Sequence, residues 1–381
     1  MALDFVVVHS PVGGGHKSAA LAIAEAARAR GLSVEVLDTF EHAPAVLGRA
    51  YLTAHLAWTG WAPDLYGSAY FGTKHRHGGA FDPVRRAADH VAWAGLVQHV
   101  MALGPRAVVA THHLPLVVLG RARRKGRLAS PLVGVVTDYG AHAVWAERGV
   151  DALCVPGAEA LGDLVDQGFA ASRLSVTGIP VRRAFESIPV VEDPAPGESL
   201  RVLVTSGGFG VGPVEQIVRS FAGARNVELT IVCGKGAGVE RRVRSVVAET
   251  GPARVIGFEK DMPARIAQAH VVVGKAGGLT VSEAMTAGRP MVIAGAVPGN
   301  ESINADLVTR AGAGITASPA DVGPVVSALR AAGLIAVMGQ SARRMVVHHA
   351  SDRVVDVALD LVALTTRDAT QLRFMAAIAS S

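Results

Sequence analysis

Residues 5–19 read FVVVHSPVGGGHKSA, and this stretch indicates the fold. Its opening run at 5–8 is apolar and rich in valine, as in a strand that is buried on both faces. A glycine-rich turn follows, and the alanine-rich residues 17–30 predict a helix that ends at Gly31. A strand that leads through a glycine turn into a helix is the opening unit of a Rossmann-like domain.

The same order of elements recurs along the chain. The first half has further short apolar runs at 34–37, 107–110, 132–136 and 152–155. The second half begins again with a strand at 201–204 and a glycine-rich turn, and its later strands are expected at 228–233, 254–256, 271–273 and 291–293. Strands that alternate with helices predict an α/β protein with two Rossmann-like domains, each built on a parallel sheet.

Composition marks the expected domain boundaries. Residues 186–198 are acidic and rich in proline, which predicts a linker at 185–198. The N-terminal domain is then expected at 1–184 and the C-terminal domain at 199–352. The last segment, 353–381, reads as a helix and is expected to pack back towards the N-terminal domain.

Bulk composition excludes several classes of protein. Half of the residues are apolar (50%), which is far from a disordered chain. Cys154 and Cys233 are distant in sequence and predict neither a disulfide framework nor a metal site. The apolar runs are short and no basic leader precedes the first, so a cytoplasmic protein is expected, with peripheral contact at the inner face of the membrane as an option.

One basic cluster stands out from a net charge of +5. It is either a solvated loop or a patch for anionic lipid headgroups, and no aromatic-rich motif accompanies it to favour nucleic acid. Its members are Arg121, Arg123, Arg124, Lys125 and Arg127.

The first glycine-rich turn carries a candidate catalytic group. Gly14 and Gly15 allow the backbone to approach a ligand, and the helix N-terminus behind them favours an anion. His16 could exchange a proton near pH 7 at this place. A structural or helix-capping histidine is the alternative.

Glycine-rich turns in the second half predict a nucleotide site. Gly207, Gly208 and Gly210 suit a phosphate-facing turn, but no acid closes the next strand as an NAD site requires. A stronger signal is the run GKAGGLTVSE at 274–283, where a glycine-rich loop precedes a helix that carries a carboxylate. Glu283 could bind both hydroxyls of a ribose, or be a surface charge. The other candidates in this run are Lys275, Gly277, Gly278 and Thr280.

Two further segments suggest sugar and acceptor recognition. The loop VPGNESIN at 297–304 offers polar groups behind a strand end, which suits sugar hydroxyls or an ordinary surface loop. Residues 51–71 concentrate aromatic side chains, which are typical of a core or of a greasy acceptor site where one end of each ring stays wet. The candidates are Trp58, Trp61, Tyr66 and Tyr70 in the aromatic segment, with Glu301 and Asn304 in the loop.

No Asp-x-Asp motif and no cluster with metal-ligand spacing occurs in the sequence. The sequence therefore disfavours a sugar transferase that chelates the diphosphate through a metal. Glycine turns, helix dipoles and basic side chains are expected to stabilise the leaving group instead, with no metal and no cofactor.

Taken together, these motifs resemble the monogalactosyldiacylglycerol synthase and processive diacylglycerol glucosyltransferase family, which is related to MurG-type transferases. The resemblance spans nearly the whole chain. It rests on GGGHKSA at 13–19, TDY at 137–139 with His142 and Trp145, GIPV at 178–181, the 275–283 run and PGNE at 298–301 with Asn304. The 58–70 segment, with PDLY at 63–66, looks like the acceptor region of the family.

The resemblance implies a GT-B fold, in which two Rossmann-like domains face a central cleft. It implies an inverting, metal-independent hexose transfer from a UDP-sugar to a lipid or other hydrophobic acceptor, preferably diacylglycerol-like. His16 is then the general base, and Asp138 orients it or binds the acceptor. Glu283 would bind the ribose, Phe258 would lie near the uracil, and Glu301 and Asn304 would face the sugar; His142 and Trp145 would lie on the acceptor side.

Several functions stay open at this point. The 298–301 loop differs from many relatives, so the donor could be UDP-galactose, UDP-glucose or UDP-GlcNAc. The acceptor could be the aglycone of a natural product. A UDP-GlcNAc 2-epimerase-like enzyme or a non-catalytic nucleotide-sugar sensor would share the fold, although the aromatic segment argues against the first.

Overall fold

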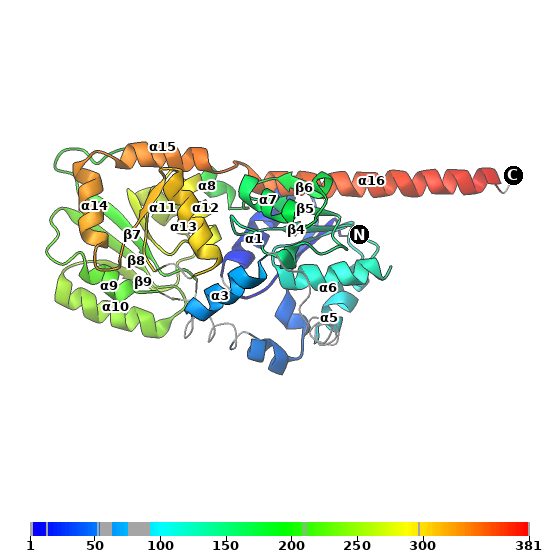
Figure 1. Cartoon of the computed structure of the whole chain (residues 1–381), viewed down its shortest axis with the longest axis horizontal. Coiled ribbons are helices and arrows are strands. Elements are labelled where there is room, and N and C mark those ends of the chain that lie inside the picture. Colours follow the sequence, from blue (N-terminus) through cyan, green and yellow to red (C-terminus); the bar gives the residue numbers. More distant parts are fainter. Residues whose placement is uncertain are drawn as a thin grey trace.

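The computed structural model describes residues 3–12, 14–51, 53, 63–74, 92–208, 210, 212–295 and 298–379. Its elements fall into two sheets with helices on both sides (Figure 1). Each sheet has six strands, and all pairings are parallel. This confirms the predicted fold class.

The first sheet has the strand order β2-β1-β3-β4-β5-β6. Its strands are β1 (Phe5–His9), β2 (Val34–Asp38), β3 (Ala107–Ala110), β4 (Leu132–Val135), β5 (Ala152–Val155) and β6 (Leu174–Val176). Its helices are α1 (Gly14–Ala29), α3 (Pro63–Thr73), α5 (Ala94–Leu103), α6 (His113–Arg124) and α7 (Ala158–Asp166).

The second sheet has the strand order β12-β11-β10-β7-β8-β9. Its strands are β7 (Leu200–Thr205), β8 (Val227–Val232), β9 (Arg254–Ile256), β10 (Val271–Gly274), β11 (Met291–Ile293) and β12 (Gly314–Thr316). Around it lie α9 (Val214–Arg219), α10 (Ala237–Thr250), α11 (Met262–Gln268), α12 (Gly278–Thr286), α13 (Asn300–Arg310), α14 (Val322–Ala331) and α15 (Ile335–Met345).

The strands predicted from apolar runs are all present, with ends that differ by one residue at most. The sequence analysis missed β6 and β12. Both are edge strands of three residues and are largely exposed or half-buried. An edge strand that is not covered on both faces needs no continuous apolar run, so its sequence carries little signal.

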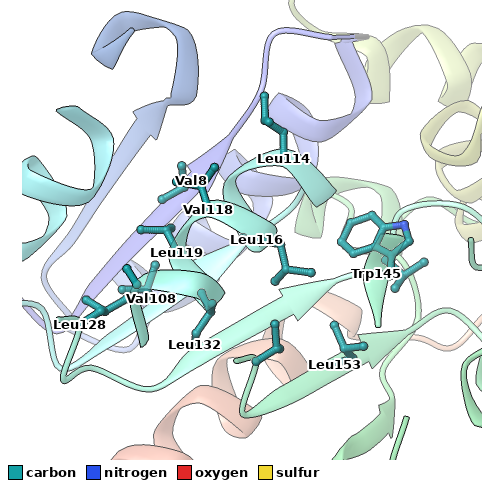
Figure 2. Close-up of a cluster of buried hydrophobic side chains, with 14 of the residues drawn as sticks. Val8, Val108, Leu114, Leu116, Val118, Leu119, Leu128, Leu132, Trp145 and Leu153 are labelled. Carbon is teal, nitrogen blue, oxygen red and sulfur yellow. The ribbon is translucent and has the colours of Figure 1, made fainter. Parts of the chain in front are cut away.

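The first sheet is buried on both faces by different parts of the chain. On one face, side chains from the strands pack with those of α6, among them Val8, Leu116, Leu132 and Leu153 (Figure 2). On the other face lie Ile23 of α1 and, from the end of the chain, the buried valines of α16 (Ala350–Ala379). Helix α16 therefore contributes to the core of the first sheet although it follows the second sheet in sequence (Figure 1).

The chain passes from one sheet to the other twice, and hydrogen bonds join the two connecting segments. The first runs through α8 (Arg183–Glu186), and the second joins α15 to α16. Glu186 accepts a hydrogen bond from the His349 backbone N–H at 2.8 Å, and its other oxygen lies 2.8 Å from His348 Nδ1. Ser351 Oγ donates to the Val181 carbonyl at 2.9 Å.

Within the described ranges, no single helix is long and apolar enough to cross a membrane. The helices Val322–Ala331 and Ile335–Arg367 meet that criterion only as a pair, and the pair is bent by 103°.

Candidate active site

His16 lies near the start of α1, where the turn after β1 meets the ends of β3 and β4. Its Nδ1 is 2.8 Å from the Thr111 carbonyl oxygen and 3.0 Å from Thr137 Oγ1. A carbonyl oxygen only accepts, so Nδ1 carries the proton. In the neutral ring Nε2 is then the basic nitrogen. Thr111 Oγ1 also donates to the His16 carbonyl at 2.9 Å, which holds the backbone of this turn.

Two further histidines stand beside His16, and the sequence analysis missed them. The His112 ring meets the His16 ring edge-on, with centroids 4.5 Å apart, and the His113 ring lies 4.1 Å from that of His112. His112 caps α6, since its Nδ1 accepts from the Leu114 backbone N–H at 3.2 Å. The signal that could have found the pair is its position directly after the buried strand at 107–110, on the sheet edge that His16 occupies.

Asp138 follows β4 and contacts the second half of the chain. Burial raises its pKa to about 6, against hydrogen bonds from Asn300, Asn304 and the Gly278 backbone N–H that favour the ionised form. Among the described residues, no hydrogen bond joins Asp138 to His16. The idea that Asp138 orients His16 is therefore corrected: the Thr111 carbonyl occupies that place.

Asn304 is completely buried, and its side chain is fully used. Its Oδ1 accepts from the Tyr139 backbone N–H at 2.9 Å, while Nδ2 donates to the Ala276 carbonyl at 2.9 Å and to Asp138 Oδ1 at 3.2 Å. The prediction that Asn304 faces a sugar stays a prediction; in the structure its three hydrogen bonds all go to protein groups. It joins α13 to the segment after β4.

Glu283 lies on α12, and its side chain is half-buried. Burial raises its pKa to about 7, and only the charge of Arg182 opposes the shift. Within the part of the chain that the structure describes, this carboxylate accepts no hydrogen bond. A buried carboxylate without donors is a place where ligand hydroxyls can bind with little competition.

The glycines of both turns lie where the two halves of the chain meet. A Cβ on Gly208 would lie 3.2 Å from Gly14 Cα, and one on Gly15 would lie 3.3 Å from Leu279. A Cβ on Gly278 would come within 2.0 Å of the Thr137 carbonyl oxygen. At Gly208 and Gly278 the backbones of the two halves approach each other, whereas Gly15 faces the side chain of Leu279.

The glycine turn after β7 also needs unusual backbone angles. Gly207 and Gly210 have φ of 70° and 72°, a region that other residues rarely adopt. The Lys235 backbone N–H donates to the Gly208 carbonyl at 3.1 Å, and Lys235 Nζ lies 5.2 Å from the centre of the Phe258 ring. Phe258 is 52% exposed, so one face of this aromatic ring is available beside the turn.

An ion pair stands next to the start of α12. Lys275 Nζ and Glu301 Oε1 are 3.0 Å apart, with 19% and 13% of the side chains exposed. A Cβ on Gly277 would lie 3.8 Å from Glu301 Oε1 and 4.0 Å from Thr280 Oγ1. The structure thus brings Glu301 of the predicted loop together with Lys275, Gly277 and Thr280 of the predicted nucleotide run.

On the other side of His16, helix α3 packs on the loop after β4. The rings of Tyr70 and His142 are 5.1 Å apart, and Thr73 Oγ1 lies 3.0 Å from His142 Nε2. Leu65 and Phe71 on the same helix are 64% and 50% exposed. Helix α3 therefore contacts the loop after β4 through Tyr70 and Thr73 and leaves two large apolar side chains exposed.

Not every predicted acceptor residue can be placed there. Trp145 is only 6% exposed and belongs to the core beneath His113, so its ring cannot form an open surface, and that expectation is corrected. Trp58, Trp61 and the side chain of Tyr66 lie outside the described residues.

The basic cluster is partly structural. Arg123 forms a two-pronged ion pair with Asp151 and also donates to the Ala129 carbonyl at 2.9 Å. Arg124 Nε lies 3.0 Å from Glu147 Oε1. These two charges are balanced inside the fold, while Lys125 and Arg127 are exposed.

Among the residues described, no group of three or more His, Cys, Asp and Glu side chains could hold a metal ion. The charged groups described above include Lys275, Glu301, Asp138 and Glu283.

Comparison with known proteins identifies the two halves. Residues 16–181 match the family model of monogalactosyldiacylglycerol (MGDG) synthase, and residues 201–328 match the glycosyltransferase family 28 C-terminal domain. The chain is a glycosyltransferase with a GT-B fold. The resemblance read from the sequence is thereby confirmed.

Named relatives of this glycosyltransferase include two from Bacillus. It is 26% identical over 322 residues to a processive diacylglycerol beta-glucosyltransferase of Bacillus thuringiensis (strain Al Hakam), a stretch that covers 81% of each chain. It is 26% identical over 301 residues to an uncharacterised glycosyltransferase of Bacillus subtilis (strain 168), covering 77% of this chain and 78% of that one.

A solved structure supports the fold of the glycosyltransferase. MurG from Acinetobacter baumannii aligns with a TM-score of 0.61 at 19% identity, over 94% of this chain and 99% of its own. At this identity the likeness shows the GT-B fold.

Proposed function

We propose that this glycosyltransferase moves a hexose from a UDP-sugar to the hydroxyl of a diacylglycerol-like lipid, with inversion and without a metal. The observation that carries the proposal is the fixed tautomer of His16. Its Nδ1 is held by the Thr111 carbonyl at 2.8 Å, so Nε2 is the nitrogen that can accept a proton. The substrate class follows from the MGDG synthase match and the named Bacillus thuringiensis relative.

The donor would bind at the edge of the second sheet. Glu283, buried and without donors among the described residues, would accept hydrogen bonds from the two ribose hydroxyls. The exposed face of Phe258 would lie near the uracil. Gly207, Gly208, Gly210 and the start of α12 at Gly277 would surround the diphosphate.

Lys275 and Glu301 would change partners when the donor binds. In the structure each neutralises the other at 3.0 Å. A diphosphate beside Lys275 would attract its ammonium group, and Glu301 would then accept from hydroxyls of the hexose. Sugar choice would depend on this pair, and UDP-glucose, UDP-galactose and UDP-GlcNAc are the donors to compare.

Catalysis would proceed by a single displacement. The acceptor oxygen attacks C1 of the hexose while its proton passes to His16 Nε2, and the bond from C1 to the diphosphate breaks on the opposite face. The products are the β-glycoside, UDP and a protonated His16, which returns its proton to water. Backbone N–H groups and Lys275 stabilise the charge that develops on the leaving diphosphate.

The acceptor would approach along α3. Tyr70 packs on His142, and the same helix carries the exposed apolar side chains of Leu65 and Phe71. A lipid hydroxyl that reaches His16 from this helix could keep its acyl chains on these side chains or in a membrane. Peripheral contact with an anionic membrane, through α3 and the exposed Lys125 and Arg127, belongs to the same proposal.

The test is UDP release from purified protein with each of the three UDP-sugars, in the presence and absence of diacylglycerol vesicles. Release with one sugar that requires diacylglycerol supports the proposal. Release that requires a soluble hydrophobic aglycone would move the function to natural-product glycosylation. Tight UDP binding without release with any acceptor would contradict a transferase and favour a nucleotide-sugar sensor.

A further inference from the structure

Three consecutive residues after β4 make contacts in different directions. Thr137 is bonded towards the first half of the chain, whereas Asp138 and Tyr139 are bonded towards the second. All of these contacts are buried or half-buried. We call residues 137–139 the clasp.

On the first-half side, the clasp touches the candidate base. Thr137 Oγ1 lies 3.0 Å from His16 Nδ1 and shares the proton that Nδ1 gives to the Thr111 carbonyl. Thr137 is 3% exposed, so its hydroxyl has little freedom to turn away. A displacement of this residue would therefore disturb the direction in which His16 Nε2 points.

On the side of the second half, the clasp is bonded to the buried side-chain amide of Asn304. Asn304 accepts from the Tyr139 backbone N–H at 2.9 Å and donates to Asp138 Oδ1 at 3.2 Å. Its bond to the Ala276 carbonyl, at 2.9 Å, fixes the amide to the loop before α12. Tyr139 adds a second connection, since its hydroxyl lies 3.0 Å from Ser282 Oγ on α12.

The contact leaves no room for a side chain. A Cβ on Gly278 would lie 2.0 Å from the Thr137 carbonyl oxygen and 3.0 Å from Asp138 Oδ1. A Cβ on Gly140, which follows the clasp, would lie 2.9 Å from Ile303 on α13. The clasp therefore forms only when the helices of the second sheet are pressed against the end of β4.

We propose that the clasp couples closure of the two domains to the position of the base. Asn304 is then a positioning residue: by holding Asp138 and Tyr139 it sets Thr137, and through Thr137 it sets His16. The proposal rests on the proposed function, because it assigns His16 to proton transfer. The physical reason is that the base and the donor groups lie on different domains and must be brought into register for each turnover.

The experiment compares Asn304→Ala with Asp306→Ala, an exposed position two residues further along α13. For Asn304→Ala we expect kcat to fall about 10- to 100-fold, as for a reacting group displaced by an ångström. The Kd for UDP should change little, because Glu283 and the glycine turns are intact. Asp306→Ala should match the parent protein in both values.

A distance measurement tests the coupling without turnover. Spin labels are placed at Asp166→Cys on α7 and Arg241→Cys on α10, both exposed, while the native Cys154 and Cys233 are buried. The parent protein with UDP should show a narrow distribution of distances. Asn304→Ala should broaden it towards longer distances, and Asp306→Ala should not.

A second variant distinguishes a loss of coupling from a loss of folding. Tyr139→Phe removes only the hydroxyl that faces Ser282 and should give a smaller loss of kcat with an unchanged melting temperature. Parent-like kcat in Asn304→Ala, faster turnover, or lost kcat with an unchanged distance distribution would each overturn the coupling. If the parent protein releases no UDP with any acceptor, the proposed function fails, while the distance measurement still decides whether the clasp holds the domains together.

Discussion

At the scale of single residues, the chemistry depends on which polar side-chain atoms form hydrogen bonds within the protein and which do not. The Thr111 carbonyl, 2.8 Å from Nδ1, decides the tautomer of His16. Glu283 is the converse case, a buried carboxyl to which the described residues donate no hydrogen bond. The first arrangement prepares a base and the second prepares a site for hydroxyl groups. Replacement of His16 should therefore affect turnover, and replacement of Glu283 should affect donor binding.

Replacement of His16 by Ala should remove the base and leave the donor site intact. Loss of a positioned base costs about 10²–10⁴ in rate. We expect kcat to fall by that factor, with the Kd for UDP unchanged in calorimetry. Glu25→Ala, an exposed position on the same helix, is the control. Full activity in His16→Ala would refute the assignment.

Replacement of Glu283 by Ala should do the opposite. A charge-assisted hydrogen bond contributes about 1.5–3 kcal/mol, which corresponds to about 10- to 100-fold in UDP affinity. The Kd for UDP should rise by that factor, and at saturating donor kcat should be much less affected. Unchanged UDP affinity would rule out the ribose role.

The raised pKa of Glu283 also predicts a pH dependence of stability. Its pKa is about 7 in the folded chain against an ordinary value of 4.5, so the folded chain holds the proton more tightly. The free energy of unfolding should therefore fall as pH rises from 4.5 to about 7. Glu283→Gln should weaken this trend and should melt higher than the parent at pH 8 but not at pH 4. A parent-like pH profile in Glu283→Gln would show that another group, such as Asp138, carries the effect.

At the scale of elements, α3 is a helix that leaves large apolar side chains exposed. It places Tyr70 and Thr73 against His142 and leaves Leu65 and Phe71 exposed. Helices that cover a sheet normally direct such side chains inward. Exposed aromatic and apolar side chains on such a helix suit contact with the acyl chains of an acceptor.

Truncation of the aromatic ring on α3 should affect the acceptor alone. An aromatic contact contributes about 0.5–1.5 kcal/mol, so Tyr70→Ala should raise the KM for diacylglycerol about 3- to 10-fold. The Kd for UDP should not change. Val337→Ala, an exposed apolar side chain on α15, is the matched control. Equal acceptor kinetics in both variants would remove α3 from the acceptor path.

At the scale of the whole molecule, the end of the chain completes the first domain. Val354, Val355, Ala358 and Val362 of α16 pack with Phe5 and Ile23 in one core cluster. Arg30, directly after α1, adds an ion pair to Asp352 at 3.0 Å. The two sheets are thus linked by α8 on one crossing and by α16 on the other, which restricts how the domains can move apart.

A cavity under α16 should destabilise the protein without touching the active site. Val355→Ala removes two buried methyl groups and should lower the free energy of unfolding by about 2 kcal/mol. Leu364→Ala on the same helix, where the side chain is 55% exposed, should have almost no effect. Thermal melting with and without UDP measures both. Equal stability of the two variants would show that α16 does not contribute to the core.

The sequence by itself determined the layers of this protein and the residue types of its site. Continuous apolar runs such as 5–8 and 271–273 predicted buried parallel strands, because strands covered on both faces contain few polar residues. Glycines next to those runs marked the turns where the two domains meet. His16, Lys275 and Glu283 were predicted from the glycine-rich turns beside them, and Glu301 from the polar loop behind a strand end.

Only the tertiary structure decided which of those residues are available to a ligand. Asn304 and Trp145 stand in motifs that resemble a binding site, yet the first is used up by three protein bonds and the second is in the core. The partner of His16 is a backbone carbonyl at Thr111, which no side-chain pattern reveals. Burial and hydrogen bonding arise from segments more than a hundred residues apart, as between Tyr139 and Asn304, and local sequence carries no record of such long-range contacts.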